Sequence, residues 1–305
     1  MAGRRAAHGP PQGAAEEQRL AWIQGQSFGH GVETIAPWWE IAGHLFEYRV
    51  DLDRLPLRDR DLSVRPITDA DAPAIEACYR SVARRNHGYP DRNHYLRTRV
   101  RNPRLGAATG FLVEADGAVE GYLYMVAVHD QKGYQHRLHL TDFQAATARA
   151  GRRLFALLAD HARMASTARW QGGPNDPIVE LLPEFLYEMN VVEQWMLRIL
   201  DVPRAFEARG WPAGVTAESQ LEIEDPDIAE NHGRFVLAVA DGAAEVSPGG
   251  AGHLRMHVRD LAPLYTGYHP PATLAAMDRL QGPDSALATA ATVFAAPCPA
   301  MADMF

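Results

Sequence analysis

The side chains best suited to metal or covalent chemistry in this sequence are its histidines and its single lysine. His253 and His257 lie on one face of a predicted strand, whereas His136 and His139 are three positions apart and point to opposite faces. A metal site needs ligands that converge, so these pairs predict histidines on a sheet surface and no bound metal. The only lysine, Lys132, falls in a predicted turn and is the one candidate for Schiff-base chemistry.

One basic segment has the composition of a phosphate-binding turn. The run TARAGRRLFALLADH carries Arg149, Gly151, Arg152 and Arg153, and backbone N–H groups at the start of a helix can hold a pyrophosphate. The apolar spacing, however, predicts one helix from Phe143 to Met164, which places the glycine inside that helix and away from its first turn. We therefore expect the arginines to form a solvated helix face.

Three aromatic residues near the N-terminus are candidates for binding a cationic amine. Phe28, Trp38 and Trp39 offer ring faces that attract cations, and Glu33 is the nearest acid. The alternative is a hydrophobic patch or an interface. Together with Phe46, these residues are expected on an exposed apolar surface that favours a homo-oligomer or association with a related chain.

Composition limits the function classes. A chain of 305 residues with 47% hydrophobic residues has room for two domains, and its net charge of -8 argues against nucleic acid as the main partner. Cys78 and Cys298 give neither a disulfide framework nor a zinc pattern. Because the sequence has no signal peptide, no apolar run of membrane-spanning length and no hydrolase, NTPase or zincin motif, we expect a cytoplasmic protein without a membrane partner.

The elements that must position these residues fall into two groups along the chain. Asp116-Gly117 and Asp241-Gly242 each stand between apolar runs, and this dipeptide tolerates the positive φ of a tight hairpin turn. Up to about Pro212, strands alternate with helices, which predicts an α/β domain, and Glu16 to Gln24 is expected to be a short helix. Beyond Pro212, four short strands precede three helices, which predicts an α+β domain with an open sheet.

The two groups meet at a hinge that also carries a family resemblance. Trp195 to Ile199 reads as a strand, and Asp201 follows as a helix N-cap with Pro203 in the first turn. This stretch, WMLRILDVPRAFEARGWP, resembles the Eis-like N-acetyltransferases of the GNAT superfamily, as do LEIED, NHGRFVLAVADG and LRMHVRDLAPLYTGYHPPATLAAMDRL. RWQGGPNDPIVELLPE is similar to the central domain of the same family, and IQGQSFGHGVETIAPWWEIAG to the end of its N-terminal domain.

The resemblance implies a domain order. Residues 1–15 are expected to be a disordered tail, 16–44 a remnant of the end of the N-terminal GNAT domain, 45–210 a central GNAT-like domain, and 212–305 a sterol-carrier-protein-like domain. Only 47 residues run from Glu16 to Leu62, whereas a domain usually needs about 100. The acetyl-CoA-binding core of the N-terminal domain is therefore expected to be missing from this chain.

The resemblance also implies a reaction, the transfer of an acetyl group from acetyl-CoA to a primary amine of an aminoglycoside or a protein lysine. In the family, the carboxylate of a C-terminal aromatic residue is the base, a role that would fall to Phe305. His30 stands at the position of the family tyrosine that acts as general acid. Because the cofactor turn was not found, we expect the abridged chain to be impaired or inactive. The alternative is a non-catalytic module for assembly or for binding a small apolar ligand.

Overall fold

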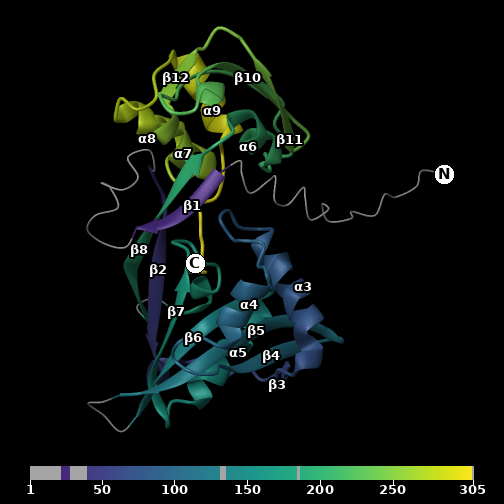
Figure 1. The fold of residues 1–305 in the computed structure, drawn as a ribbon. Coiled ribbons are helices and arrows are strands. Elements are labelled where there is room, and N and C mark those ends of the chain that lie inside the picture. Colours follow the sequence, from purple (N-terminus) through teal and green to yellow (C-terminus); the bar gives the residue numbers. More distant parts are fainter. Residues whose placement is uncertain (1–21, 28–39, 131–134, 184–185, 304–305) are drawn as a thin grey trace, which may run out of the picture. The chain divides into compact units, whose positions relative to one another are not determined.

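The computed structural model describes residues 22–27, 40–130, 135–183 and 186–303, and these form two compact units (Figure 1). One unit, the sheet unit, joins Gly43–Gln194 to the tail that starts at Pro297. The other, the C-terminal unit, joins Trp195–Ala296 to the segment that ends at Ala42. The division therefore does not follow chain order, because the last residues return to the sheet unit.

The larger sheet has eight strands in the order β1-β8-β2-β7-β6-β5-β4-β3. Antiparallel pairing joins β2 to β7 and connects β3, β4, β5 and β6 in sequence, whereas β6 and β7 run parallel. The strands are β1 (Trp22–Ser27), β2 (Glu40–Asp51), β3 (Ser63–Pro66), β4 (Thr109–Ala115), β5 (Ala118–His129), β6 (His136–Ala145), β7 (Ala165–Gly172) and β8 (Tyr187–Ile199).

Helices cover both faces of this sheet. Helix α5 (Ala148–Asp160) buries Leu154, Phe155 and Leu158 in the core that contains Val113 and Leu123. Helices α3 (Ala72–Ala83) and α4 (His94–Arg101) pack on the opposite face, in a second core with Leu112, Tyr122 and Tyr124. The two cores use alternate residues of β4 and β5, as the period of a strand requires. The mixed α/β fold expected for this part of the chain is thus confirmed.

The predicted hairpins are present. Ala115 pairs with Ala118 around Asp116-Gly117, and Ala240 pairs with Ala243 around Asp241-Gly242. All four turn residues have positive φ, between 51° and 80°. The predicted N-cap is also confirmed, since the Asp201 side chain accepts a hydrogen bond from Arg204 N at the start of α6 (Val202–Ala208).

Two predicted helices are wrong. Residues 143–145 belong to strand β6, and α5 begins only at Ala148, where the Thr147 side chain caps the helix by accepting from Ala150 N. The apolar residues on either side of Thr147 fit a continuous helical spacing, and the cap was overlooked. Residues 22–24 of the helix predicted from Glu16 to Gln24 lie in strand β1, and the rest lies outside the described residues.

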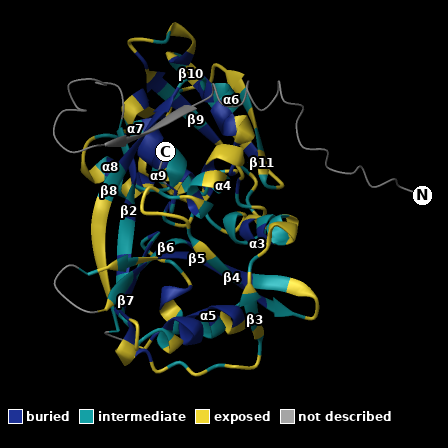
Figure 2. Cartoon of the chain, turned by 60° about the horizontal axis from the view of Figure 1, so that its bottom comes forward, coloured by how far each residue is buried: buried dark blue, intermediate teal, exposed yellow. Residues whose placement is uncertain are grey.

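The C-terminal unit is the predicted α+β fold. Its sheet has the order β11-β10-β9-β12, from β9 (Ala217–Glu224), β10 (Gly233–Ala240), β11 (Ala243–Pro248) and β12 (Leu254–His257). Three helices follow, namely α7 (Val258–Thr266), α8 (Pro271–Ala276) and α9 (Asp284–Val293). Alternate residues of β9 and β10 are buried, including Leu221, Ile223, Leu237 and Val239, so one face of this sheet is covered (Figure 2).

Among the residues described, none of the helices combines the length and the apolar composition that a membrane crossing demands.

Candidate functional site

The C-terminal tail is packed into the sheet unit. Ala300 N donates a hydrogen bond to His87 O at 2.7 Å, Met301 is fully buried, and Asp303 is 6% exposed. The part of the tail up to Asp303 therefore lies ordered in the sheet unit. Met304 and Phe305 lie outside the described residues.

Two glycines make room for the tail. A Cβ atom on Gly173 would lie 2.2 Å from Ala300 Cβ, and one on Gly88 would lie 2.6 Å from Ala300 O. Gly88 also has a φ of 93°, which disfavours any side chain there. Tyr48 Oη donates to Gly173 O at 2.5 Å and holds the backbone of Gly173 in place. The channel for Ala300 is therefore built for glycine on both sides.

The last described residue of the tail is held by a buried arginine. Arg92 Nε donates to Asp303 Oδ2 at 2.9 Å, and the two terminal nitrogens of the same guanidinium bind both oxygens of Asp142, one of them at 3.1 Å. All three side chains are at most 6% exposed. We call Arg92, Asp142 and Asp303 the tail clamp.

Asp142 is held rigidly within the clamp. Tyr122 Oη donates to its Oδ2 at 2.7 Å, and Gln144 Nε2 donates to its Oδ1 at 3.0 Å. The Arg92 guanidinium lies over the Tyr79 ring, 4.0 Å from the centroid, which adds a cation–π contact. Every oxygen of Asp142 therefore has at least two donors, and Arg92 is fixed from two sides.

A bulge in β6 directs Asp142 to this face of the sheet. Met125 pairs with Leu140, but Tyr124 pairs with Asp142, so Thr141 is an extra residue. An extra residue switches all following side chains to the other face. Leu140 consequently lies in the α5 core, whereas Asp142 faces the side of α3 and α4.

The charges of the clamp do not balance, because one guanidinium faces two carboxyl groups. Burial alone would lower the pKa of Arg92, but Asp142 and Asp303 together hold that pKa well above its ordinary value. Burial raises the pKa of Asp303, and the negative charge of Asp142 raises it further, against the attraction of Arg92. The adjacent cavity, lined by Arg97, Tyr124 and others, measures roughly 40 Å³ and admits only water. The clamp therefore suits holding the tail and not binding a substrate.

In the sheet unit, the start of helix α5 has the composition to hold the pyrophosphate of acetyl-CoA, but its groups are already bonded to protein. Helix α5 does follow a strand, but Thr147 Oγ1 donates to Glu120 Oε2 at 2.6 Å, and Arg149 Nε donates to the same oxygen at 2.8 Å. A Cβ on Gly151 would lie 2.4 Å from Leu181 Cδ1, so this glycine faces protein. A carboxylate that pairs with Arg149 beside the first turn, and a buried glycine, do not fit the cofactor.

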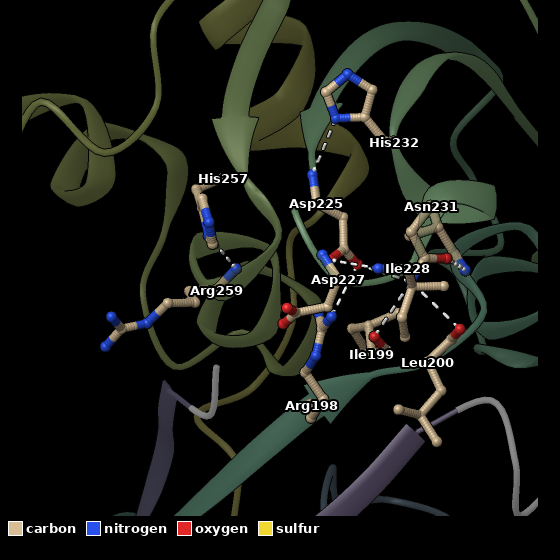
Figure 3. A network of polar contacts seen from close by, with 11 residues as sticks. Arg198, Ile199, Leu200, Asp225, Asp227, Ile228, Asn231, His232, His257 and Arg259 are labelled. Carbon is tan, nitrogen blue, oxygen red and sulfur yellow. Dashed lines mark hydrogen bonds and ion pairs between the residues drawn. The ribbon is translucent and has the colours of Figure 1, made fainter. Parts of the chain in front are cut away.

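Figure 3 shows a second buried polar network, in the C-terminal unit. Arg198 Nη2 donates to both oxygens of Asp225, at 2.8 and 2.9 Å, and the backbone N–H groups of Asp227 and Ile228 donate to Asp225 Oδ1. Asn231 Nδ2 donates to Asp225 Oδ2 and to carbonyl groups at the end of β8. This network ties the end of β8 to the loop after β9, which is a structural role.

The C-terminal unit also contains a cavity of roughly 230 Å³ beside β9 and α9. It is lined by Glu218, Ser219, Gln220, His253, Leu254, Pro283, Ser285, Ala286 and Thr289. Six of these nine residues have polar side chains, so the cavity offers hydrogen-bonding groups beside apolar surface.

The site residues predicted from the sequence cannot be assembled into one site. His30, Phe28, Trp38, Trp39 and Phe305 all lie outside the described residues. Phe46, expected on an exposed patch, is partly buried and packs against the α5 core. Within the described ranges, no group of three or more His, Cys, Asp or Glu side chains is placed to hold a metal.

Sequence reasoning overlooked the tail clamp. Arg92 is 50 positions from Asp142 and 211 from Asp303, so no spacing rule connects them. One signal was present, because Asp142 stands between Leu140 and Phe143, and an acid among buried apolar residues requires a partner.

Comparisons with known proteins agree with this fold. A model of an acetyltransferase (GNAT) domain matches residues 81–199, and a model of a sterol carrier protein domain matches residues 202–302. The chain is 39% identical over 119 residues to N-acetyltransferase Eis of Mycobacterium tuberculosis, covering 37% of this chain and 28% of that protein. It is 31% identical over 183 residues to an uncharacterized N-acetyltransferase of Streptomyces griseus, covering 58% of this chain and 43% of that protein.

The fold matches the crystal structure of a GCN5-related N-acetyltransferase from Anabaena variabilis with a TM-score of 0.88 and 28% identity. That match covers 96% of this chain and 75% of the other. The chain spans less than half the length of the curated relatives it matches. The chain thus contains a GNAT acetyltransferase domain followed by a sterol carrier protein domain, and it is similar to the Eis-like N-acetyltransferases.

Proposed function

We propose that the protein takes part in the transfer of an acetyl group from acetyl-CoA to a primary amine, of an aminoglycoside or of a protein lysine. The GNAT domain and the similarity to N-acetyltransferases support the reaction type, and the packed tail supports the role of the C-terminus in it. The tail is the single observation that carries this proposal, because a frayed chain end could not keep a reactive group in place.

The proposed role of the Phe305 carboxylate is that of a base. A primary amine is an ammonium ion at neutral pH, and only its neutral form has the lone pair that attacks a carbonyl carbon. A carboxylate near the amine accepts that proton, and a desolvated setting raises its pKa toward the working range. His30, at the position of the family tyrosine, is proposed as the proton donor, and Phe28, Trp38 and Trp39 as the ring faces for the cationic amine.

The start of α5 does not fit acetyl-CoA, because Glu120 is bonded to Thr147 and Arg149 at this strand-to-helix turn. No step is therefore assigned to the donor here. When bound, acetyl-CoA supplies the activated acetyl group.

One observation favours the alternative of a non-catalytic assembly module. Met189, Val191 and Val192 on the first half of β8 are 43–53% exposed (yellow in Figure 2), and apolar surface of this kind favours association with another chain. A homo-oligomer, or a complex with a related chain, is proposed on this ground.

Calorimetric titration with acetyl-CoA, followed by a thiol-release assay with aminoglycosides and a lysine peptide, tests the proposal. Heat of binding together with amine-dependent release of free thiol supports acetyl transfer. Neither heat nor thiol release, from a chain whose folding is verified by its circular dichroism and cooperative melting, overturns the catalytic proposal and leaves the assembly role.

A further inference from the structure

The tail clamp is more elaborate than packing requires. Arg92, Asp142 and Asp303 bring one positive and two potentially negative groups out of water, and buried ion pairs are weak contributors to net stability. The bulge at Thr141 additionally interrupts the ladder between β5 and β6 in order to direct Asp142 to this face. These features give position and direction to a chain segment, which apolar packing of Met301 alone would not.

The Arg92–Asp142 pair of the clamp does not need the tail, whereas Asp303 needs Arg92. Asp142 receives hydrogen bonds from Tyr122 and Gln144 besides those from Arg92, so the Arg92–Asp142 pair remains fully bonded without the tail. Asp303 has Arg92 as its charged partner. Loss of Asp303 therefore releases the chain beyond Met301 and leaves the Arg92–Asp142 pair bonded.

The clamp acts close to the chain end. Only Met304 stands between Asp303 and Phe305 in the sequence, and a chain extends at most about 3.6 Å per residue. An anchored Asp303 therefore limits how far the two residues after it can reach, whereas the next anchors, Ala300 and Met301, are farther from them along the chain.

We propose that Arg92 is a positioning residue that, bridging Asp142 and Asp303, anchors the C-terminal tail and so serves the proposed role of the C-terminus. The catalytic meaning of this inference rests on the proposed function, but the anchoring does not. Arg92 touches no reacting atom in this scheme and acts through the tail.

The anchoring is tested by release of Phe305 with carboxypeptidase A, which removes C-terminal aromatic residues. Asp303→Ala is expected to speed release at least tenfold over the wild type, and Asp303→Glu, which keeps a carboxylate, to restore part of the protection. Arg92→Lys, which cannot bridge two carboxyl groups in a fork, is expected to behave like Asp303→Ala.

A matched control is Arg198→Met, which breaks a similarly buried Arg–Asp pair in the C-terminal unit. It is expected to change the release rate less than twofold at temperatures well below melting. Equal release rates in the wild type, Asp303→Ala and a free PAMADMF peptide overturn the anchoring.

Kinetics separate the positioning role from the proposed function. Asp303→Ala and Arg92→Lys are expected to lower kcat at least tenfold while the KM for acetyl-CoA stays within twofold. Faster tail release with an unchanged kcat overturns the positioning role and leaves acetyl transfer standing. A protein that shows no transfer while the tail-release pattern holds refutes the proposed function and leaves the anchoring.

Discussion

Replacing Asp225 by alanine should selectively destabilise the C-terminal unit. The substitution removes the acceptor for Arg198, Asn231 and two backbone N–H groups, as Figure 3 shows. Arg198 is 6% exposed in its side chain, so its charge would remain buried without a partner. Losing one partner of a buried pair costs about 3–5 kcal/mol, and the orphaned N–H groups bring the expected loss toward the upper end of that range.

Urea unfolding followed by hydrogen exchange in β9 and β10 measures this loss. For a unit of this size, with a slope of about 1–2 kcal/mol per molar urea, the midpoint should fall by about 2–4 M. Asp227→Ala, which alters an exposed side chain in the same loop, is the control and should stay within about 0.5 kcal/mol of wild type. A loss below about 1 kcal/mol for Asp225→Ala would refute the structural role assigned to this network.

The effect of Asp225→Ala should also depend on pH. Burial works to raise the pKa of Asp225, but hydrogen bonds from Asn231 and Arg198 lower it overall. A depressed pKa stabilises the fold above the unfolded pKa, near 4, and that stability is lost as the pH falls through the folded value. The difference between variant and wild type should therefore shrink toward pH 3, and a constant difference would contradict this assignment.

Two further predictions concern the sheet unit. Burial raises the pKa of Asp176 to about 6, so Asp176 destabilises the fold increasingly as the pH rises from about 4 through 6. Asp176→Asn should leave the melting temperature unchanged at pH 4 and raise it by a few degrees at pH 7.5. The free energy of unfolding should rise by at most about 3 kcal/mol at pH 7.5, and because Asp176 is partly exposed we expect a gain of about 1 kcal/mol. Gly173→Ala places a Cβ 2.2 Å from Ala300 Cβ and should at least triple hydrogen exchange at Ala300 and Met301, whereas Gly214→Ala, which meets nothing within 4 Å, should not.

Local rules predicted the parts of the fold that are locally determined. The Asp-Gly hairpins and the Asp201 cap were predicted because a dipeptide or one side chain decides the backbone there. The stretch from Phe143 to Thr147 was misassigned, since Phe143 fits both a strand face and a helix stripe, and the hydroxyl of Thr147 decides between them.

Local sequence patterns could not predict the arrangement of the candidate site. The tail contacts His87, Gly88 and Gly173, which are far from it in the sequence, and only the folded sheet brings them to Ala300. The bulge at Thr141 is likewise set by pairing with β5 and leaves no local pattern in the sequence. The family resemblance indicated Phe305 but not the residues that hold the tail beside it.

The central claim is that this chain provides the base for acetyl transfer through its C-terminal carboxylate. The most direct measurement compares thiol release by the 305-residue chain with release by a variant lacking only Phe305, in the presence of acetyl-CoA and a saturating primary amine. General-base catalysis contributes about 10²–10⁴-fold, so the variant should lose at least 100-fold in kcat with little change in the KM for acetyl-CoA. Equal kcat values in the two proteins would contradict the account.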